Sequence, residues 1–150
     1  DFKVTPQQLE EAITEKTKLI MFSSPSNPTG MLYSKDELQG LANVIARHKQ
    51  ILVMADEIYE HINFEGKHES IAQFEEIYDQ VITINGVAKG FAMTGWRIGW
   101  VCGNKDAVGV LGKLKSTSDF DIKLFSTPIS LQACFNGIKS LIFTNRVCRS

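Results

Sequence analysis

Three short apolar runs, each ending in polar residues, constrain the fold of this 150-residue chain more than any other feature. The runs are residues 19–22 (LIMF), 51–55 (ILVMA) and 81–84 (VITI), and a fourth strand is predicted within 97–103 (RIGWVCG). Each of the three runs is continuous and does not alternate with polar residues, which is typical of a strand buried on both faces of a parallel sheet.

Helical segments separate these runs. Thr5 followed by Pro6 has the form of an N-cap with proline at the first helical position. Ser34 with Glu37 three residues later predicts a capping box at the start of a second, amphipathic helix. A third helix is expected over residues 105–115. Strands that alternate with helices through short connections predict an α/β fold with a mainly parallel sheet.

Composition and charge exclude several classes of function. The net charge of −1 provides no basic surface, so nucleic acid is not expected as a partner. Neither an apolar run of the roughly 18 residues that a membrane span needs nor a signal-peptide pattern is visible. We therefore expect a cytoplasmic protein with no membrane partner.

The cysteines and histidines do not predict a metal site. The three cysteines are widely spaced, and no CxxC pair or ligand spacing to a histidine occurs. They are expected to be reduced, structural thiols. They are Cys102, Cys134 and Cys148.

Polar residues that follow the predicted strands indicate a ligand site. Asn27, Asp56 and Lys89 each lie just past the C-terminal end of a predicted strand, where ligands bind in α/β sheets. Asp56 could instead cap the turn that follows it. Tyr59 lies one turn after Asp56, so it could face the same ligand or pack in the core.

Lys89 and Arg97 have unusual surroundings for surface charges. Lys89 lies among small and apolar residues (GVAKGFA), and poor solvation would lower its pKa and make the amine a nucleophile or Schiff-base partner. Nearby glycines would let another molecule approach the backbone closely. Arg97 begins an apolar strand, a setting that suits binding of a phosphate or carboxylate. Either residue taken alone could be an ordinary surface charge.

At these residues the chain resembles a known family. SPSNPTG, DEIYE and NGVAKGFAMTGWRIG occur in the order and spacing of the signature segments of class I aminotransferases, which are pyridoxal-phosphate enzymes of fold type I. The resemblance is closest to the bacterial aspartate aminotransferases. It is strong over residues 4–103 and weak after 103, where the final segment, NGIKSLIFTNRVCRS, does not continue it. Residues 1–150 are accordingly expected to form part of the cofactor-binding large domain.

The resemblance implies a role for each candidate residue. Lys89 would bond covalently to pyridoxal 5′-phosphate and later act as the base in proton transfer. Asp56 would pair with the protonated pyridine nitrogen, which lets the ring accept electrons. Tyr59 and Asn27 would hydrogen-bond the 3-oxygen of the ring, with Asn27 also near the substrate carboxylate. Arg97 would bind the cofactor phosphate.

The resemblance also implies an activity and an assembly. The activity is transfer of an amino group between an aspartate-like amino acid and a 2-oxo acid, by a homodimer with active sites at its interface. Family members are much longer, so this chain is expected to be an incomplete fragment and inactive alone. Two alternatives stay open, a pyridoxal-phosphate lyase or synthase of the same fold and a non-catalytic truncated remnant.

Two details of the signature segments lead to expectations about geometry. Some branches of the family bind phosphate with a serine three residues before the lysine, where this chain has Gly86. That contact is in doubt here. The Asn27–Pro28 bond is expected to be cis, because the loop turns sharply after a strand and X–Pro is the peptide bond for which cis costs least.

Overall fold

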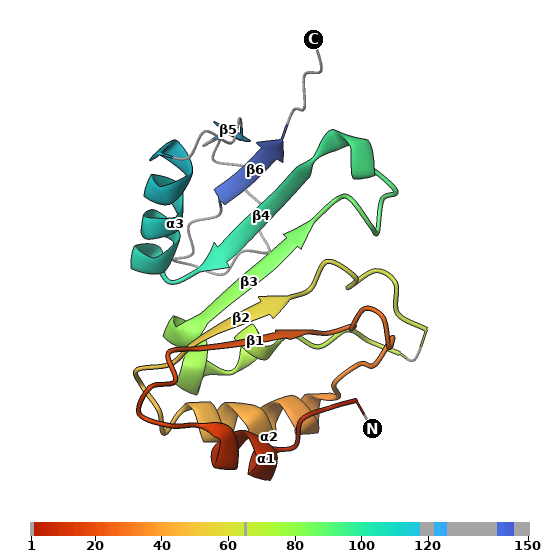
Figure 1. The fold of residues 1–150 in the computed structure, drawn as a ribbon. Helices are drawn as coiled ribbons and strands as arrows, with labels where there is room; N and C mark the ends of the chain where they lie inside the picture. The colour runs from red at the N-terminus through yellow and green to blue at the C-terminus, as the bar shows by residue number, and fades with distance from the viewer. Residues whose placement is uncertain (1, 65, 118–121, 126–140, 146–150) are drawn as a thin grey trace.

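The computed structural model describes residues 2–64, 66–117, 122–125 and 141–145 (Figure 1). The helices are α1 (Pro6–Ala12), α2 (Lys35–Ile45) and α3 (Lys105–Thr117), with 3-10 turns η1 (Ile71–Gln73), η2 (Glu75–Gln80) and η3 (Thr94–Trp96). The strands are β1 (Leu19–Ser23), β2 (Leu52–Asp56), β3 (Val81–Gly86), β4 (Ile98–Gly103), β5 (Ile122–Phe125) and β6 (Leu141–Asn145). All four predicted strands and all three predicted helices are therefore present.

The strands within these described ranges form one sheet in the order β1-β2-β3-β4-β6-β5. β1, β2 and β3 are parallel, with Leu19 opposite Leu52 and Asp56 opposite Ile84. β4 runs antiparallel to β3, because a loop without a crossover helix joins them. The predicted α/β fold is confirmed, and its parallel part is β1–β3.

One face of the sheet is covered by α1, α2 and the turns η1 and η2 (Figure 1). The apolar stripe of α2 packs here, with Leu38, Ala42 and Ile45 at most 1% exposed. Val53 and Ala55 of β2 meet it from the sheet. We call this side of β1 and β2 the covered face, and it holds the main hydrophobic core.

Local sequence signals set the start and the packing of α2. The predicted capping box is confirmed, because Ser34 Oγ accepts from Glu37 N and the Glu37 carboxylate accepts from Ser34 N at 2.7 Å. Gly40 lies against Pro6 of α1, and a Cβ on this glycine would be 2.7 Å from Pro6 Cγ. The absent side chain therefore lets the two helices approach closely.

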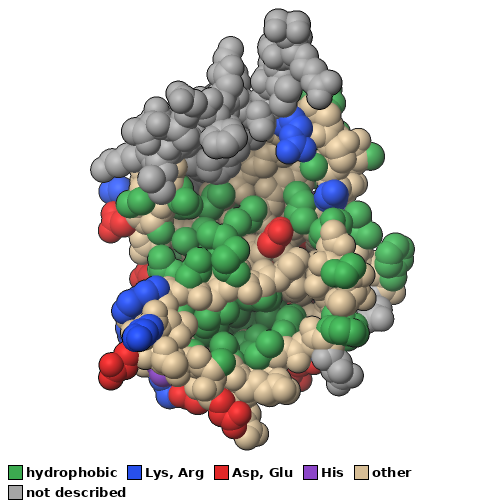
Figure 2. Space-filling model, viewed as in Figure 1, with side chains coloured by type: hydrophobic (Ala, Val, Ile, Leu, Met, Phe, Trp, Pro, Cys, Tyr) green, Lys and Arg blue, Asp and Glu red, His purple; other side chains and the backbone are tan. Residues whose placement is uncertain are grey.

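The opposite face of the sheet is only partly covered. α3 packs there through Val108 against Ile82 and Val101. Over β1 and β2, by contrast, Met21 remains 68% exposed and Leu52 remains 37% exposed. Figure 2 shows hydrophobic side chains gathered where Figure 1 places the strands of the sheet. We call this side of β1 and β2 the uncovered face. No helix in the described part of the chain is long and apolar enough to cross a membrane.

Candidate active site

The carboxyl ends of β1, β2 and β3 meet at one edge of the sheet. Ser23 pairs with Asp56, and Asp56 pairs with Ile84. The ladder continues one step further, because Ser24 N donates to Asp56 O at 3.2 Å and Glu57 N donates to Ile84 O at 2.9 Å. Three loops leave the sheet together from this edge (Figure 1). Every site residue predicted from the sequence lies at this edge or in one of these loops.

Contacts between the loops bring three of the predicted residues together. Asn27, from the loop after β1, donates Nδ2 to the hydroxyl oxygen of Tyr59 at 3.1 Å. Tyr59 lies in the turn after β2, and Lys89 Nζ, from the loop after β3, is 5.7 Å from the centre of its ring. An amide, a phenol and an amine from distant parts of the sequence thus surround one small volume.

Asp56 ends β2 and is partly buried. Because side chains alternate along a strand, Asp56 lies on the same face as Leu52 and Met54, which is the uncovered face. Its Oδ1 accepts from Ile58 N at 3.1 Å, so the turn cap considered as an alternative is present. A carboxylate offers two oxygens with about four acceptor positions. The cap therefore leaves Asp56 able to accept a ligand proton as well.

Lys89 lies in a tight turn between β3 and η3. Ala92 N donates to Lys89 O at 3.1 Å, and Met93 N donates to Val87 O at 3.4 Å, so hydrogen bonds close the turn around the lysine. The poor solvation predicted for Lys89 is wrong for this structure, in which the residue is exposed. Its neighbours in the sequence therefore do not cover the side chain in this structure.

Arg97 lies immediately before β4, in the left-handed conformation with φ of 53°. Its Nη1 donates to Thr94 O at 3.4 Å within the same turn, and the side chain is exposed. β4 returns alongside β3, with Gly86 opposite Gly99. A Cβ on Gly86 would lie 2.8 Å from Ile98 O, so a serine does not fit there without a shift of the backbone. The close approach of the two strands explains why this position holds a glycine, which has no hydroxyl group to offer a phosphate.

The loop after β1 forms one wall of a pocket. The predicted cis bond at Asn27–Pro28 is confirmed, and Ser24–Pro25 is also cis. The pocket has a volume of about 280 Å³ and lies between residues 25–32 and 59–64. Asn27 and Tyr59 both line it, so it adjoins the cluster of predicted residues.

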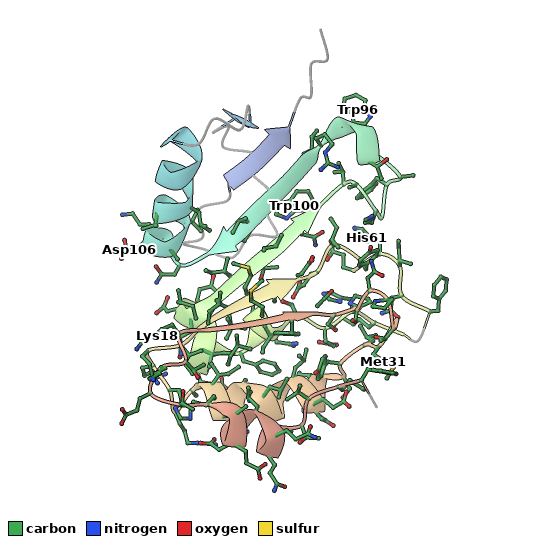
Figure 3. All side chains as sticks on the ribbon, viewed as in Figure 1. Lys18, Met31, His61, Trp96, Trp100 and Asp106 are labelled. Carbon is green, nitrogen blue, oxygen red and sulfur yellow. The ribbon has the colours of Figure 1, made fainter. Side chains whose placement is uncertain are left out.

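Sequence reasoning missed a neighbour of the lysine turn. The ring of His61 packs edge-on against Phe91, with centroids 5.2 Å apart, and Figure 3 shows His61 at the ends of β2 and β3. A Cβ on Gly90 would lie 2.7 Å from His61 Cδ2. The glycine beside Lys89 does permit a close approach, as predicted, but His61 of the same chain makes it. The small residue at 90 was the available signal, and the sequence alone does not identify its partner.

Comparison with known proteins identifies the family. Residues 1–134 match the model of the family described as aminotransferase class I and II. This chain belongs to that family. It is 42% identical over 147 residues to an aspartate/prephenate aminotransferase of Cereibacter sphaeroides, covering 97% of this chain and 36% of that protein. It is 49% identical over 143 residues to an aspartate aminotransferase of Bacillus subtilis, covering 91% of this chain and 35% of that protein. The chain thus spans about a third of the length of these relatives.

Solved structures of aminotransferases have the same fold. The aspartate aminotransferase from Thermus thermophilus with maleate superposes with a TM-score of 0.72 at 41% identity, over 77% of this chain and 29% of that chain. The enzyme from Rhizobium meliloti gives a TM-score of 0.76 at 36% identity, over 79% of this chain and 30% of that one. The fold type I architecture implied by the sequence motifs is confirmed.

Aminotransferases of the aspartate type use pyridoxal 5′-phosphate. The functional groups found here fit that cofactor. The exposed amine of Lys89 suits its aldehyde, and the hydroxyl of Tyr59, whose ring centre is 5.7 Å from that amine, suits the ring 3-oxygen. A partly buried carboxylate at Asp56 suits a protonated ring nitrogen, and the exposed guanidinium of Arg97 suits the phosphate.

Proposed function

We propose that this chain carries the cofactor-binding residues of a pyridoxal-phosphate-dependent aminotransferase. The reaction would move an amino group between an aspartate-like amino acid and a 2-oxo acid. The observation that carries the proposal is the convergence of Asn27, Tyr59 and Lys89 from three separate loops at the ends of three parallel strands. Residues 1–150 would then be part of the large, cofactor-binding domain.

The hydrogen bond between Asn27 and Tyr59 has a direction that matters for this function. Asn27 Nδ2 donates to the phenolic oxygen, so the hydroxyl proton of Tyr59 remains available to another acceptor. In the proposed site that acceptor is the 3-oxygen of the cofactor ring. Asn27 would therefore orient the tyrosine as well as line the pocket beside it.

Charge and proton handling would be divided among Asp56, Lys89 and Arg97. When bound, the cofactor supplies an electron sink for the carbanion that forms at the substrate α-carbon. Asp56 would hold the proton on the ring nitrogen through its carboxylate. Lys89 would attach the cofactor and then carry a proton on Nζ between substrate and product positions. Arg97 would bind the phosphate with its planar guanidinium, in the absence of a side chain at position 86.

The finer points of the proposal rest on the relatives. Proteins named aspartate aminotransferase and aspartate/prephenate aminotransferase support a dicarboxylic amino acid as substrate. We further propose that the full-length protein is a cytoplasmic homodimer, on the grounds of the family resemblance.

Covalent trapping of the cofactor tests this function. The full-length protein would be incubated with pyridoxal 5′-phosphate, reduced with borohydride, digested and mapped by mass spectrometry. We expect the phosphopyridoxyl group on Lys89. Lys89→Arg should abolish the label, whereas Lys67→Arg, at an 85% exposed side chain outside the site, should retain it. Label on another lysine, or none, would contradict the proposal.

A further inference from the structure

Asp56 and Glu57 are adjacent carboxylates that lie on opposite sides of the sheet. Asp56 is on the uncovered face with the proposed cofactor site, and alternation along the strand directs Glu57 to the covered face. Glu57 is only 6% exposed, although it lies next to the end of β2. A buried carboxylate is costly unless charged or hydrogen-bonding groups meet it. The contacts of Glu57 therefore need an explanation.

The two oxygens of Glu57 face residues from the far end of the following loop, Ser70 through a hydrogen bond and His68 through an ion-pair contact without hydrogen-bond geometry. Ser70 Oγ donates to Oε1 at 2.6 Å, and His68 Nε2 lies 3.2 Å from Oε2. Ser70 Oγ also accepts from Ala72 N at 3.2 Å, which caps η1. The carboxylate thus joins the end of β2 to the start of η1, and it closes the intervening chain into a loop.

The charge state of His68 is consistent with this contact. Burial of the ring by itself would lower the pKa of His68, but the Glu57 carboxylate, with weaker contributions from Glu60 and Glu69, raises it above its ordinary value. Atoms of Glu57, Glu60 and His68 all lie within 4.8 Å of one another, as in some cation sites. The contacts that the structure shows for Glu57 are with Ser70 and His68, and they are sufficient to account for its burial.

The loop that Glu57 closes carries the tyrosine of the proposed site. Glu60 N donates to Glu57 O at 2.9 Å, and Ile62 N donates to Tyr59 O at 2.8 Å, so the turn is built directly on Glu57. Tyr59 in turn contacts Asn27 and Lys89. Displacement of Glu57 would move both the residue before it, Asp56, and the turn after it.

We propose that Glu57, held by Ser70 and His68, is a positioning residue that fixes Asp56 and Tyr59 toward the cofactor. It acts from the covered face and touches neither cofactor nor substrate. This inference rests on the proposed function for its catalytic consequence, whereas the closure of the loop itself is independent of the cofactor.

The test compares four variants of the full-length protein. Glu57→Ala removes both contacts, and Ser70→Ala removes one hydroxyl group with little risk to folding. Glu60→Gln is the matched control, because Glu60 belongs to the same cluster but its carboxylate contacts His61 and does not close the loop. Glu57→Gln keeps an acceptor oxygen for Ser70 and should restore most of the wild-type behaviour.

Two measurements separate positioning from general stability. The first is the pH midpoint of the visible absorbance of bound pyridoxal 5′-phosphate, which depends on the hydrogen bond from Tyr59. It should rise by about one pH unit in Glu57→Ala, the equivalent of one lost hydrogen bond, by less in Ser70→Ala, and not in Glu60→Gln. An unchanged midpoint in Glu57→Ala, with a lowered melting temperature alone, would overturn the proposal.

The second measurement does not need the cofactor. Hydrogen exchange in the apoprotein should be at least tenfold faster at the amides of Glu60 and Ile62 in Glu57→Ala, while the amides of β2 keep their protection. Unchanged exchange at these amides would overturn the loop closure. If the wild-type protein did not bind pyridoxal 5′-phosphate at all, the proposed function would be refuted. The exchange measurement would still decide whether Glu57 closes the loop.

Discussion

Both faces of β1 and β2 carry apolar side chains, but those of the covered face are packed against helices and several of those of the uncovered face are exposed to solvent. On the covered face, Val53 and Ala55 are at most 1% exposed beneath α2. On the uncovered face, Leu52 and Met21 of the same two strands remain in contact with solvent. Exposed apolar patches of this kind mark surfaces that bind something or associate.

The difference indicates that one face serves the stability of the fold and the other serves the proposed site. The covered face supplies packing, and the buried Glu57 lies at its edge. The uncovered face carries Asp56 at the end of an apolar strip, at the place where three loops converge. Substitutions on the covered face should therefore act on stability, and substitutions near Asp56 should act on chemistry.

The largest expected effect tests this division at Asp56. In the full-length enzyme, Asp56→Asn keeps an oxygen for the turn cap on Ile58 N but removes the charge proposed to face the ring nitrogen. Loss of one partner of a buried charge pair costs ~3–5 kcal/mol, so transamination of aspartate and 2-oxoglutarate should fall by about two to four orders of magnitude. The melting temperature should change little. Activity within tenfold of wild type would show that Asp56 is only a cap.

A smaller effect is expected on the free energy of unfolding when leucine is replaced by alanine at a buried position and at a partly exposed one. Leu38→Ala, at a fully buried position of α2, should lower the free energy of unfolding by about 2–5 kcal/mol, because it leaves a cavity in the core. Leu52→Ala, on the uncovered face, should cost less than about 1 kcal/mol. Urea denaturation of both variants measures the difference. Equal losses would mean that the uncovered face is also packed in solution.

The smallest effect on stability is expected at Met21, which is on the edge strand. Met21→Lys should change the free energy of unfolding by less than about 0.5 kcal/mol, since the side chain is mostly exposed. A lysine on an edge strand also discourages pairing with other chains. Sedimentation of this chain should show less self-association than wild type, with Val110→Lys on α3 as the control. An unfolded Met21→Lys variant would contradict the assignment of an uncovered face.

The sequence predicted the architecture well because its signals are local. The three continuous apolar runs identified β1, β2 and β3, and the Ser34–Glu37 pair identified the start of α2, whereas β5 and β6 were not predicted. The signature motifs identified the family, because three separate segments had to agree in order and spacing. The short final stretch from 146 to 150, which the motifs do not reach, lies outside the described residues.

The sequence did not predict contacts that depend on where distant side chains meet. Asp56 was predicted as a site residue because it directly follows an apolar strand, whereas no sequence signal singled out Glu57, one residue later. Its partners Ser70 and His68 lie 13 and 11 residues away through an irregular loop, and no periodic pattern links them. The prediction that Lys89 is poorly solvated was wrong for a related reason. Residues that are apolar neighbours in the sequence need not cover a side chain in space.

The opposite directions of Asp56 and Glu57 limit how this segment can evolve. Because side chains alternate along a strand, inserting or deleting one residue within β2 would reverse every direction downstream of the change. The carboxylate at position 56, proposed to face the cofactor, would then enter the apolar core, and the carboxylate at position 57 would face away from Ser70. Substitutions in this strand can be selected one at a time, but a change in its length alters packing, loop closure and chemistry together. Related sequences in which both carboxylates keep these directions should therefore keep the length of β2 even where its apolar residues vary.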